Sequence, residues 1–487
     1  MTVEKAALER ILDVQRAAFV AEGGASAEVR KSRVGRLAIA ILSSFDAIAD
    51  ALSADYGNRP PELSKALEAL PWSEDILHTL DNIEKWMEPE AIPGGFIQQK
   101  PKGVVGVMGA WNFPVTLTFE PALSALAAGN RVMMNFPEYQ VETGRVLAKI
   151  ISDTFDEAEV AFIHGDLSTS QSFSALRFDH LFFTGSPKIG SIVAQEAAKN
   201  LVPVTTELGG KNPVVVAPDA DLDLAASRIA ATRVVNGGQV CLCPDYVWVP
   251  RGIVTGFVDK LIAQYNSIFG SCLDNPAVVS IVNERNFDRI VGLVTDATAK
   301  GAKQYVAAPE GEAARLPDRA SRKIPPTVLV DVPASAEITD EEVFGPVLVV
   351  YGYDDLQEAI DYITARPAPL AAYWYGDDGA DFRRFLDRTT SGGVTRNDGL
   401  LHALLPGAPF GGIGNSGSGA YHGKAGFDTF THRRSVATVT RPDGVANPLV
   451  GDALVSAPMQ GYLDGAIAAA IKAFEDRLPA RSKSKLP

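Results

Sequence analysis

The N-terminal segment shows a helical spacing of hydrophobic and polar positions. From Ala25 to about Asp55, apolar residues recur three or four positions apart, which is the period of an amphipathic helix. The pair Pro60-Pro61 breaks this pattern, because proline cannot continue a helix interior. A second helical stretch is predicted from about Glu62 to Trp86. The chain is therefore expected to open on helices.

After Pro89 the pattern changes to short apolar runs that alternate with helical stretches. The runs that we predict as buried strands are Val104 to Met108, Arg131 to Met134, Val160 to Ile163, His180 to Phe183, Val202 to Thr205, Pro213 to Val216 and Tyr246 to Val249. Such alternation is typical of an α/β fold, in which a parallel sheet carries helices on both faces. Ligands of these sheets lie beyond the carboxyl ends of the strands, so residues just after strands are the first candidates for a site.

The later part of the chain has a less regular pattern. Between about Cys272 and Lys323, Pro and Gly are scattered through charged sequence, which predicts surface elements and loops, and Asp340 to Val350 is predicted to be a turn that enters a buried strand. Gly461 to Arg477 is predicted to form one helix. Its charged residues Asp464, Lys472, Glu475 and Asp476 favour a docking helix over a membrane anchor. The tail from Arg477 to Pro487 is expected to be frayed.

The composition is that of a soluble, folded protein. Of the 487 residues, 46% are hydrophobic and 21% are charged, which supplies enough apolar surface for a sizeable core. The length predicts roughly two to four domains or one large composite fold. A net charge of −14 repels phosphate backbones and anionic lipids. We therefore expect neither nucleic acid nor a membrane as a partner.

The three cysteines are too few for a disulfide framework, so the fold does not require an oxidising compartment. Charged residues interrupt the first turns of the chain, and no secretory leader is predicted there. We expect a cytoplasmic protein. The six histidines are scattered, and Cys241 and Cys243 lack a second cysteine pair, so no metal site is expected.

One cysteine occupies a position suited to a nucleophile. Cys241 ends the run Asn236-Gly237-Gly238-Gln239-Val240-Cys241, a small-residue turn that follows the helical stretch Asp221 to Val235. Glu207 lies at a strand end before Gly209 and Gly210, and a carboxylate there could take the thiol proton or activate a water. Taken alone, each has an ordinary interpretation, since a single cysteine is most often a core residue and Glu207 a solvated strand end.

Four further segments could contribute to a site. Gly185-Ser186 follows an apolar strand and opens a helix, where free backbone N–H groups favour a phosphate, although an ordinary strand-to-helix turn is an equal alternative. Asn112, in Trp111-Asn112-Phe113-Pro114, could donate its amide into the same crevice, and Asn before Phe-Pro is also a common turn. The loops Glu341 to Pro346 and Pro409 to Gly417 contain glycines that allow tight backbone paths, for structure or for function.

Together and in this order, these segments resemble the NAD(P)-dependent aldehyde dehydrogenase superfamily from about Ala25 to Ser435. The runs Gln239 to Tyr246 and Gly419 to Gly423, followed by Phe427-Asp428-Thr429-Phe430, are similar to its class 3 branch and there to enzymes that act on coniferyl aldehyde. The resemblance implies a parallel-sheet dinucleotide-binding domain, a second α/β catalytic domain and a small β oligomerisation arm. It places these at residues 1–90 and 104–207, at 208–400, and at 91–103 with the bridging segment 401–445, followed by a C-terminal extension at 446–487.

The resemblance also implies catalytic roles. Cys241 matches the nucleophile that attacks the aldehyde carbon and forms first a thiohemiacetal and then a thioester. Asn112 matches the residue whose amide, with the backbone N–H of Cys241, stabilises the oxyanion. Glu207 matches the base that activates the hydrolytic water, and its presence argues against the branch that passes the acyl group to coenzyme A.

The cofactor site is implied in the same way. Its residues are Trp111, Asn135, Glu138, Gly185, Ser186, Leu208, Gly209, Glu342 and Phe344. Gly185 and Ser186 match the turn beside the pyrophosphate, and Glu342 and Phe344 match residues that hold the nicotinamide ribose and ring. The usual Lys-Pro-Ser-Glu motif at the adenine ribose is Asn135-Phe136-Pro137-Glu138 in this chain. Loss of the lysine and retention of the carboxylate predict NAD over NADP, with weakened cofactor binding.

The substrate implied is a small-molecule aldehyde, aromatic and similar to coniferaldehyde. The alternatives are a medium- or long-chain aliphatic aldehyde, a catalytically idle relative with a binding or structural role, and acyl hydrolysis by the same thiol without hydride transfer. A strand pair near Pro93 to Lys102 and the segment after Phe427 are implied to build the contact of a homodimer.

Overall fold

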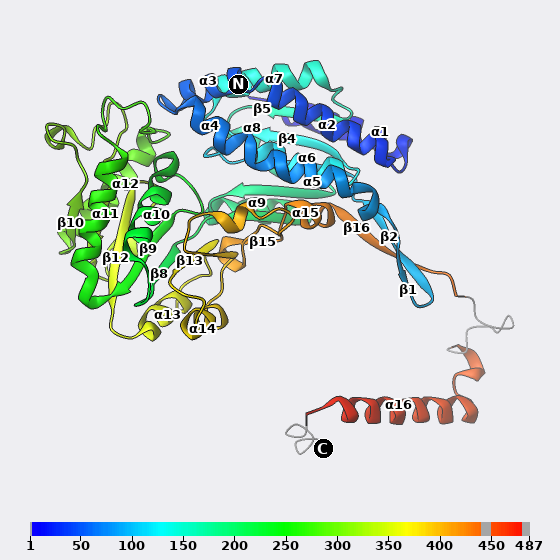
Figure 1. The fold of residues 1–487 in the computed structure, drawn as a ribbon. Helices are drawn as coiled ribbons and strands as arrows, with labels where there is room; N and C mark the ends of the chain where they lie inside the picture. The colour runs from blue at the N-terminus through cyan, green and yellow to red at the C-terminus, as the bar shows by residue number, and fades with distance from the viewer. Residues whose placement is uncertain (1, 440–449, 480–487) are drawn as a thin grey trace. The chain divides into compact units, whose positions relative to one another are not determined.

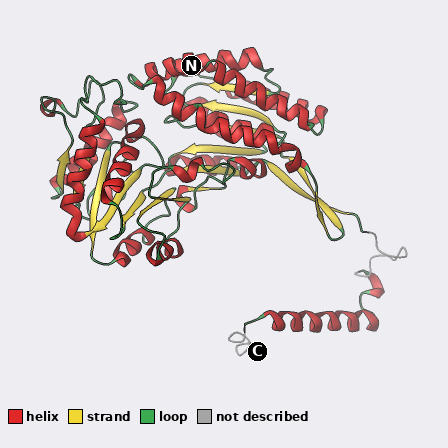
Figure 2. Cartoon of the chain, viewed as in Figure 1, coloured by secondary structure: helices red, strands yellow, loops and turns green. Residues whose placement is uncertain are grey.

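The computed structural model describes residues 2–439 and 450–479, and the chain forms two compact units (Figure 1). The first unit comprises Met1–Pro89 and Gln98–Arg434, and the second comprises Glu90–Ile97 and Ser435–Pro487. Strands and helices alternate along most of the first unit (Figure 2), as the α/β prediction requires.

A six-stranded sheet in the first unit has the strand order β15-β7-β6-β3-β4-β5. Its strands are β3 (Val104–Met108), β4 (Arg131–Phe136), β5 (Val160–His164), β6 (His180–Gly185), β7 (Val204–Leu208) and β15 (Gly417–Ser418). Neighbouring strands are parallel except β15, which is antiparallel to β7. A parallel sheet covered on both faces needs apolar residues on both, which explains why its strands are continuous apolar runs. The strands predicted in this part of the chain are confirmed.

The predicted strand at Val202 starts two residues later, at Val204. The backbone N–H of Val202 donates to the carbonyl of Ala197 at 3.1 Å, which closes the end of the preceding helix. Pro203 has no backbone N–H to give to a sheet. Ladder pairing therefore begins at Val204, opposite Leu181.

Helices cover this sheet. They are α1 (Lys5–Glu22), α2 (Ala27–Ser43), α3 (Phe45–Tyr56), α4 (Pro61–Glu68), α5 (Leu70–Met87), α6 (Thr116–Ala127), α7 (Val141–Thr154), α8 (Leu167–Ser174), α9 (Pro187–Ala198) and, later in the chain, α15 (Gly423–Thr429). The prediction of one helix from Ala25 to Asp55 is wrong, because α2 and α3 are separated at Ser44, which leaves helical geometry at φ −105° and ψ 8°. The predicted helix Glu62 to Trp86 is also interrupted, at Ala69, where Pro71 in the first turn of α5 lacks an N–H.

Among the described helices, none is by itself long and apolar enough to cross a membrane. The pair α2 and α3 reaches that length and hydropathy only together, and it is bent by 62°.

A seven-stranded sheet in the first unit has the strand order β10-β11-β12-β9-β8-β13-β14. Its strands are β8 (Asn212–Val216), β9 (Pro244–Pro250), β10 (Lys303–Val306), β11 (Thr327–Val330), β12 (Val347–Tyr353), β13 (Ala371–Tyr375) and β14 (Gly393–Arg396). The edge strand β10 is antiparallel to β11, and the other neighbouring pairs are parallel. The predicted strands at Pro213 and Tyr246 are confirmed, and the turn from Asp340 leads into β12 as predicted.

The helices of this sheet are α10 (Leu222–Val234), α11 (Val254–Ile268), α12 (Glu284–Ala299), α13 (Leu356–Thr364) and α14 (Ala380–Arg388). The segment from Cys272 to Lys323, for which loops and surface elements were predicted, contains the 16-residue helix α12. Its buried residues Phe287, Ile290 and Leu293 keep helical spacing, but charged residues between them dilute the apolar pattern.

One apolar core runs through both parallel sheets. It contains Val105 and Val132 of the first sheet, Val214 and Val247 of the second, and Leu242 of the loop that precedes β9. Two smaller cores cover the opposite faces of the sheets. The loops beyond the strand ends therefore rest on a continuous packed scaffold.

A third sheet consists of β1 (Glu90–Ile92), β2 (Gly95–Pro101) and β16 (Thr431–Ala437). Its first two strands form a hairpin, with Ile92 opposite Gly95, in the region where a strand pair was predicted. Near the C-terminus, α16 (Ala457–Arg477) contains the predicted helix and begins earlier, where the side chain of Ser456 accepts a hydrogen bond from the N–H of Met459. No residue of α16 is buried. Residues 440–449 and 480–487, which include most of the predicted frayed tail, lie outside the described residues.

Candidate active site

The loop that carries Cys241 turns sharply after α10. Residues 236–238 all have left-handed backbone, with φ between 51° and 77°. A Cβ on Gly238 would lie 2.4 Å from the backbone of Gly345, so this position requires glycine. The side-chain amide of Asn212, at the start of β8, donates to the carbonyl of Cys241 at 2.7 Å. The thiol-bearing loop is thus held between the second sheet and the segment before β12.

Glu207 reaches the site from β7, where it pairs with Gly417 of β15 and is 3% exposed. Burial raises the pKa of its carboxyl well above the usual value, and the backbone N–H of Gly412 opposes this effect by favouring the charged form. Neither carboxylate oxygen completes a well-aligned hydrogen bond with a described residue. The carboxyl group is therefore available to bind a water or to take up a proton.

Asn112 approaches the Cys241 loop from the opposite side, on the loop after β3. Its side chain is 4% exposed, and its amide Nδ2 donates to the carbonyl of Gln239 at 3.2 Å. Its backbone carbonyl accepts hydrogen bonds from the Tyr56 hydroxyl at 3.0 Å and from the Asn236 amide at 3.1 Å. The amide predicted for an oxyanion site is thus anchored two residues from the predicted nucleophile.

The half-buried thiol of Cys241 lies within electrostatic reach of two carboxyl groups. Burial raises its pKa above the ordinary value, and the negative charges of Glu342 and Glu207 raise it further. Burial and the charge of Asp245 raise the pKa of Glu342 to about 8, although Lys211 opposes the shift. Because the Glu342 carboxyl has a pKa of about 8, it is mostly neutral at neutral pH, which lowers the cost of burying it beside the thiol.

The predicted phosphate turn joins β6 to α9. The side chain of Ser186 caps α9 by accepting a hydrogen bond from the backbone N–H of Ile189 at 3.4 Å. Other N–H groups in the first turn of a helix have no partner within the helix, and the helix dipole there favours an anion. Leu208 packs under the turn, since a Cβ on Gly190 would lie 2.7 Å from its side chain. Gly185, Ser186 and Leu208 are thus brought together.

The predicted nicotinamide residues also converge. A Cβ on Gly209 would lie 2.3 Å from the Glu342 carboxylate, so the glycine leaves room for that side chain. The ring of Phe344 contacts the ring of Trp111 edge to face, with centroids 5.3 Å apart. These four residues come from three distant segments and meet beside the Cys241 loop.

Asn135 lies near the end of β4 and is 3% exposed. Its amide donates to the hydroxyl of Ser170 at 3.0 Å, while its Oδ1 has no hydrogen-bond partner among the described residues. A buried acceptor of this kind suits a ligand hydroxyl group. Glu138 is partly exposed in the turn that follows. The residues present therefore fit a nicotinamide dinucleotide, with a helix turn for its phosphates and an unpaired acceptor for a ribose.

The residues that support the loop after β3 were not predicted from the sequence. Arg59 and Glu68 form an ion pair at 2.7 Å, and both side chains are fully buried. Glu68 also accepts a hydrogen bond from the N–H of Val115 at 2.7 Å, and the Tyr56 hydroxyl donates to the carbonyl of Trp111 at 2.8 Å. In the sequence they belong to an ordinary amphipathic region, and no signal links them to the later motifs.

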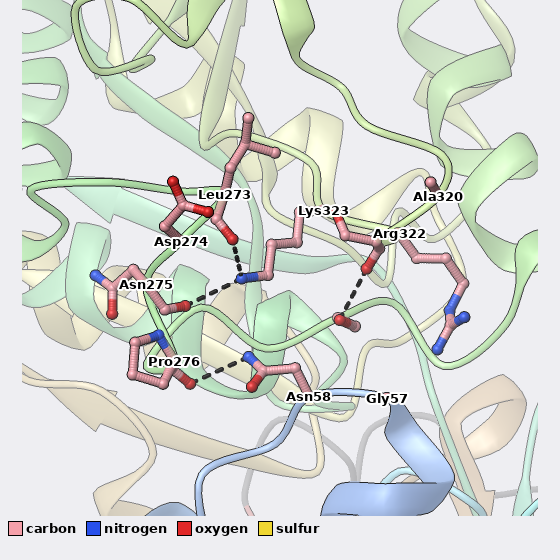
Figure 3. A pocket seen from close by; sticks show the side chains of 11 residues that line it. Gly57, Asn58, Leu273, Asp274, Asn275, Pro276, Ala320, Arg322 and Lys323 are labelled. Carbon is pink, nitrogen blue, oxygen red and sulfur yellow. Dashed lines mark hydrogen bonds between the residues drawn. The ribbon is translucent and has the colours of Figure 1, made fainter.

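A separate hollow of about 360 Å³ lies beside the turn between α3 and α4 (Figure 3). Its lining includes Asn58, Arg322 and Lys323 but none of the predicted site residues. The Lys323 ammonium donates to the carbonyls of Leu273 at 2.8 Å and Asn275 at 3.0 Å. Its cation is thus used to hold loops together. Among the described residues, no group of three His, Cys, Asp or Glu side chains could hold a metal ion.

The two sheets and the convergence of the residues predicted as thiol, carboxyl and cofactor groups are the arrangement expected of a nicotinamide-dependent oxidoreductase. The chain belongs to the aldehyde dehydrogenase family, whose sequence profile matches residues 2–436. It is 42% identical over 450 residues to the probable coniferyl aldehyde dehydrogenase of Caulobacter vibrioides, covering 90% of this chain and 92% of that one. It is 35% identical over 436 residues to the dimeric NADP-preferring aldehyde dehydrogenase of Rattus norvegicus, covering 86% and 92%.

Solved structures agree with this assignment. The substrate-bound AldH of Staphylococcus aureus superposes with a TM-score of 0.85 at 30% identity, covering 96% of this chain and 100% of that one. A mutant of aldehyde dehydrogenase C from Pseudomonas syringae, in complex with NAD+ and octanal, gives a TM-score of 0.82 at 27% identity and 91% coverage of both chains. The resemblance and the fold class predicted from the sequence are confirmed, and the protein is an NAD(P)-dependent aldehyde dehydrogenase.

Proposed function

We propose that this enzyme oxidises an aldehyde to the carboxylic acid through Cys241, with Asn112 and Glu207 as its partners. The observation that carries the proposal is their convergence on one loop. The Asn112 amide bonds to the carbonyl of Gln239 at 3.2 Å, and the Glu207 carboxyl is close enough to raise the pKa of the Cys241 thiol.

In the first half of the reaction, the Cys241 thiol gives its proton to Glu207, directly or through a water, and the sulfur attacks the aldehyde carbon. The oxygen of the resulting thiohemiacetal becomes negatively charged. Nδ2 of Asn112 and the backbone N–H of Cys241 are the donors for this oxyanion, and loss of one such donor typically costs about 10²–10³ in rate.

A bound NAD would supply the acceptor for the hydride of the thiohemiacetal carbon. The product of that step is an acyl group held as a thioester on Cys241. Glu207 releases the first proton to solvent, then takes a proton from a water that attacks this thioester and passes it to the leaving sulfur, so the carboxylic acid leaves and the thiol is restored. Gly185 and Ser186 would hold the pyrophosphate, and Glu342 and Phe344 the nicotinamide riboside.

The proposed cofactor is NAD in preference to NADP. Asn135 supplies no positive charge for a 2′-phosphate, and the carboxylate of Glu138 would repel one. The unpaired Oδ1 of Asn135 is an acceptor suited to a free ribose hydroxyl. Relaxed cofactor use is the alternative, and the NADP-preferring rat relative is the reason to measure both cofactors.

The proposed substrate is an aromatic aldehyde similar to coniferaldehyde, supported by the Caulobacter vibrioides relative. An aliphatic aldehyde of medium or long chain is the alternative, supported by the octanal held by the Pseudomonas syringae neighbour. The homodimer and the cytoplasmic location stay predictions from the sequence.

The test follows NADH and NADPH formation by the purified enzyme with coniferaldehyde, benzaldehyde and decanal. We expect NADH formation, fastest with coniferaldehyde, and its loss in a Cys241→Ala variant. Cys272→Ala is the matched control, because Cys272 is a buried cysteine outside the site, and we expect it to keep the activity. A folded wild-type protein that reduces neither cofactor would support the second candidate, a catalytically idle relative, which the altered residue Asn135 favours.

A further inference from the structure

We infer that Arg289, on α12, is a positioning residue for the cofactor, and that it acts by fixing the turn that presents Glu342 and Phe344. The inference rests on the proposed function of that turn. Arg289 donates through both terminal nitrogens, to the carbonyl of Glu342 at 3.0 Å and to the carbonyl of Val343 at 2.7 Å. A guanidinium group holds two neighbouring carbonyls in a fixed geometry, which a flexible ammonium group cannot do.

Other charged side chains hold the same turn from other elements. Lys211 donates to the carbonyl of Glu341 at 3.0 Å. Asp245 accepts a hydrogen bond from the N–H of Val343 at 3.0 Å. Arg233 donates to the carbonyl of Gly345. Every residue from 341 to 345 except Phe344 is therefore fixed through its backbone by a charged side chain.

Phe344 itself has a left-handed backbone, with φ 49°. This conformation is unfavourable for a bulky residue and persists only where the surroundings impose it. The Arg289 hydrogen bonds fix the two peptide groups that come immediately before Phe344. When they are lost, we expect the turn to relax toward ordinary backbone, which moves the Phe344 ring from Trp111 and the Glu342 carboxyl from Gly209.

Arg289 is the member of this set whose loss should act on the cofactor alone. Arg233 also donates to the carbonyl of Pro244 at 2.7 Å, close to the Cys241 loop. Lys211 pairs with Asp245 and also bonds to the carbonyl of Ile338 at 2.8 Å. Both hydrogen bonds of the half-buried Arg289, in contrast, end on the turn that carries Glu342 and Phe344.

The experiment compares wild type, Arg289→Met, Arg289→Lys and the control Arg285→Met, whose parent residue is exposed on the same helix. Isothermal titration calorimetry gives the Kd for NAD without turnover. Ester hydrolysis measures the Cys241 thiol without cofactor: the sulfur attacks p-nitrophenyl acetate, p-nitrophenol leaves, and water removes the acetyl group. Thermal melting verifies that each variant is folded.

We expect Arg289→Met to raise the Kd and the KM for NAD by about 10-fold, roughly the effect of losing a charge-assisted hydrogen bond. Ester hydrolysis by Arg289→Met should stay within about twofold of wild type. The Kd for NAD of Arg289→Lys should fall between those of wild type and Arg289→Met. Arg285→Met should match wild type in all of these measurements.

Two results would overturn the inference while the proposed function stands: an unchanged Kd for NAD in folded Arg289→Met, or a fall in ester hydrolysis as large as the loss of NAD binding. A wild-type enzyme that hydrolyses the ester but neither binds nor reduces NAD would instead overturn the proposed cofactor role, and the inference with it.

Discussion

At the scale of single residues, the surroundings of Cys241 oppose the ionisation of its thiol. Its pKa is raised by burial and by Glu342 and Glu207, although the thiolate is the form that attacks an aldehyde. The pKa of Glu342 is itself raised to about 8, so its charge develops only in mildly alkaline solution. The reactivity of the free thiol is therefore tied to the titration of a neighbouring acid.

This coupling can be measured by alkylation of Cys241 with iodoacetamide in the absence of cofactor. The rate should keep rising with pH beyond 9, because the thiol pKa lies above its ordinary value. Glu342→Gln should accelerate alkylation several-fold at pH 9, where the wild-type carboxylate is charged, and leave it unchanged at pH 6.5, where the carboxyl is already protonated. The exposed neighbour provides the control Glu341→Gln. Equal acceleration at both pH values would contradict the electrostatic explanation.

At the scale of elements, the loop after β3 depends on an ion pair that reaches it from α4 and the turn before it. Glu68 accepts hydrogen bonds from the N–H groups of Val115 at 2.7 Å and Thr116 at 3.4 Å, at the start of α6. Arg59 pairs with Glu68 at 2.7 Å and donates to the carbonyl of Asn112 at 3.4 Å. The position of Asn112 is thus set by two fully buried charges.

Glu68→Ala should lower the free energy of unfolding by about 3–5 kcal/mol, because it leaves Arg59 buried without its counter-charge. Urea denaturation measures the loss. The control is Glu62→Ala on the same helix, where the side chain is exposed and the change should stay within about 0.5 kcal/mol. The paired substitution Arg59→Met with Glu68→Leu should recover most of the stability. Equal free energies of unfolding for Glu68→Ala and the control Glu62→Ala would show that the buried pair does not hold the loop.

The elements that the sequence predicts well are those with a local cause. Strands such as Val104–Met108 follow from continuous apolar runs, and the turn before Cys241 follows from its glycines, which tolerate left-handed backbone. Arg59, Glu68 and Arg289 could not be found in this way. They act on backbone N–H and carbonyl groups, which every residue offers, so their partners leave no pattern in the sequence.

At the scale of the whole molecule, the C-terminal helix α16 has no buried residue. The apolar side chains of α16 remain open, with Phe474 71% and Ile467 59% exposed. The docking role predicted for this helix stays a prediction.

Truncation after residue 449 should therefore leave the specific activity and the melting temperature of the enzyme close to those of the full chain. Enzyme assay and differential scanning calorimetry check this directly. A loss of several degrees in melting temperature, or of most of the activity, would show that α16 supports the catalytic unit. Size-exclusion chromatography of both forms would show whether the helix contributes to self-association.

The apolar core that passes through both parallel sheets has a consequence for how such enzymes diversify. Val105 and Val214 belong to different sheets but to one continuous packed interior. Suppose that one sheet and its helices were exchanged for those of a distant relative. Side chains that do not fit one another would then meet inside this shared core, where a change of even one methylene group alters stability. New cofactor or substrate preferences are therefore easier to acquire by changes in the loops at the strand ends than by recombination of whole halves.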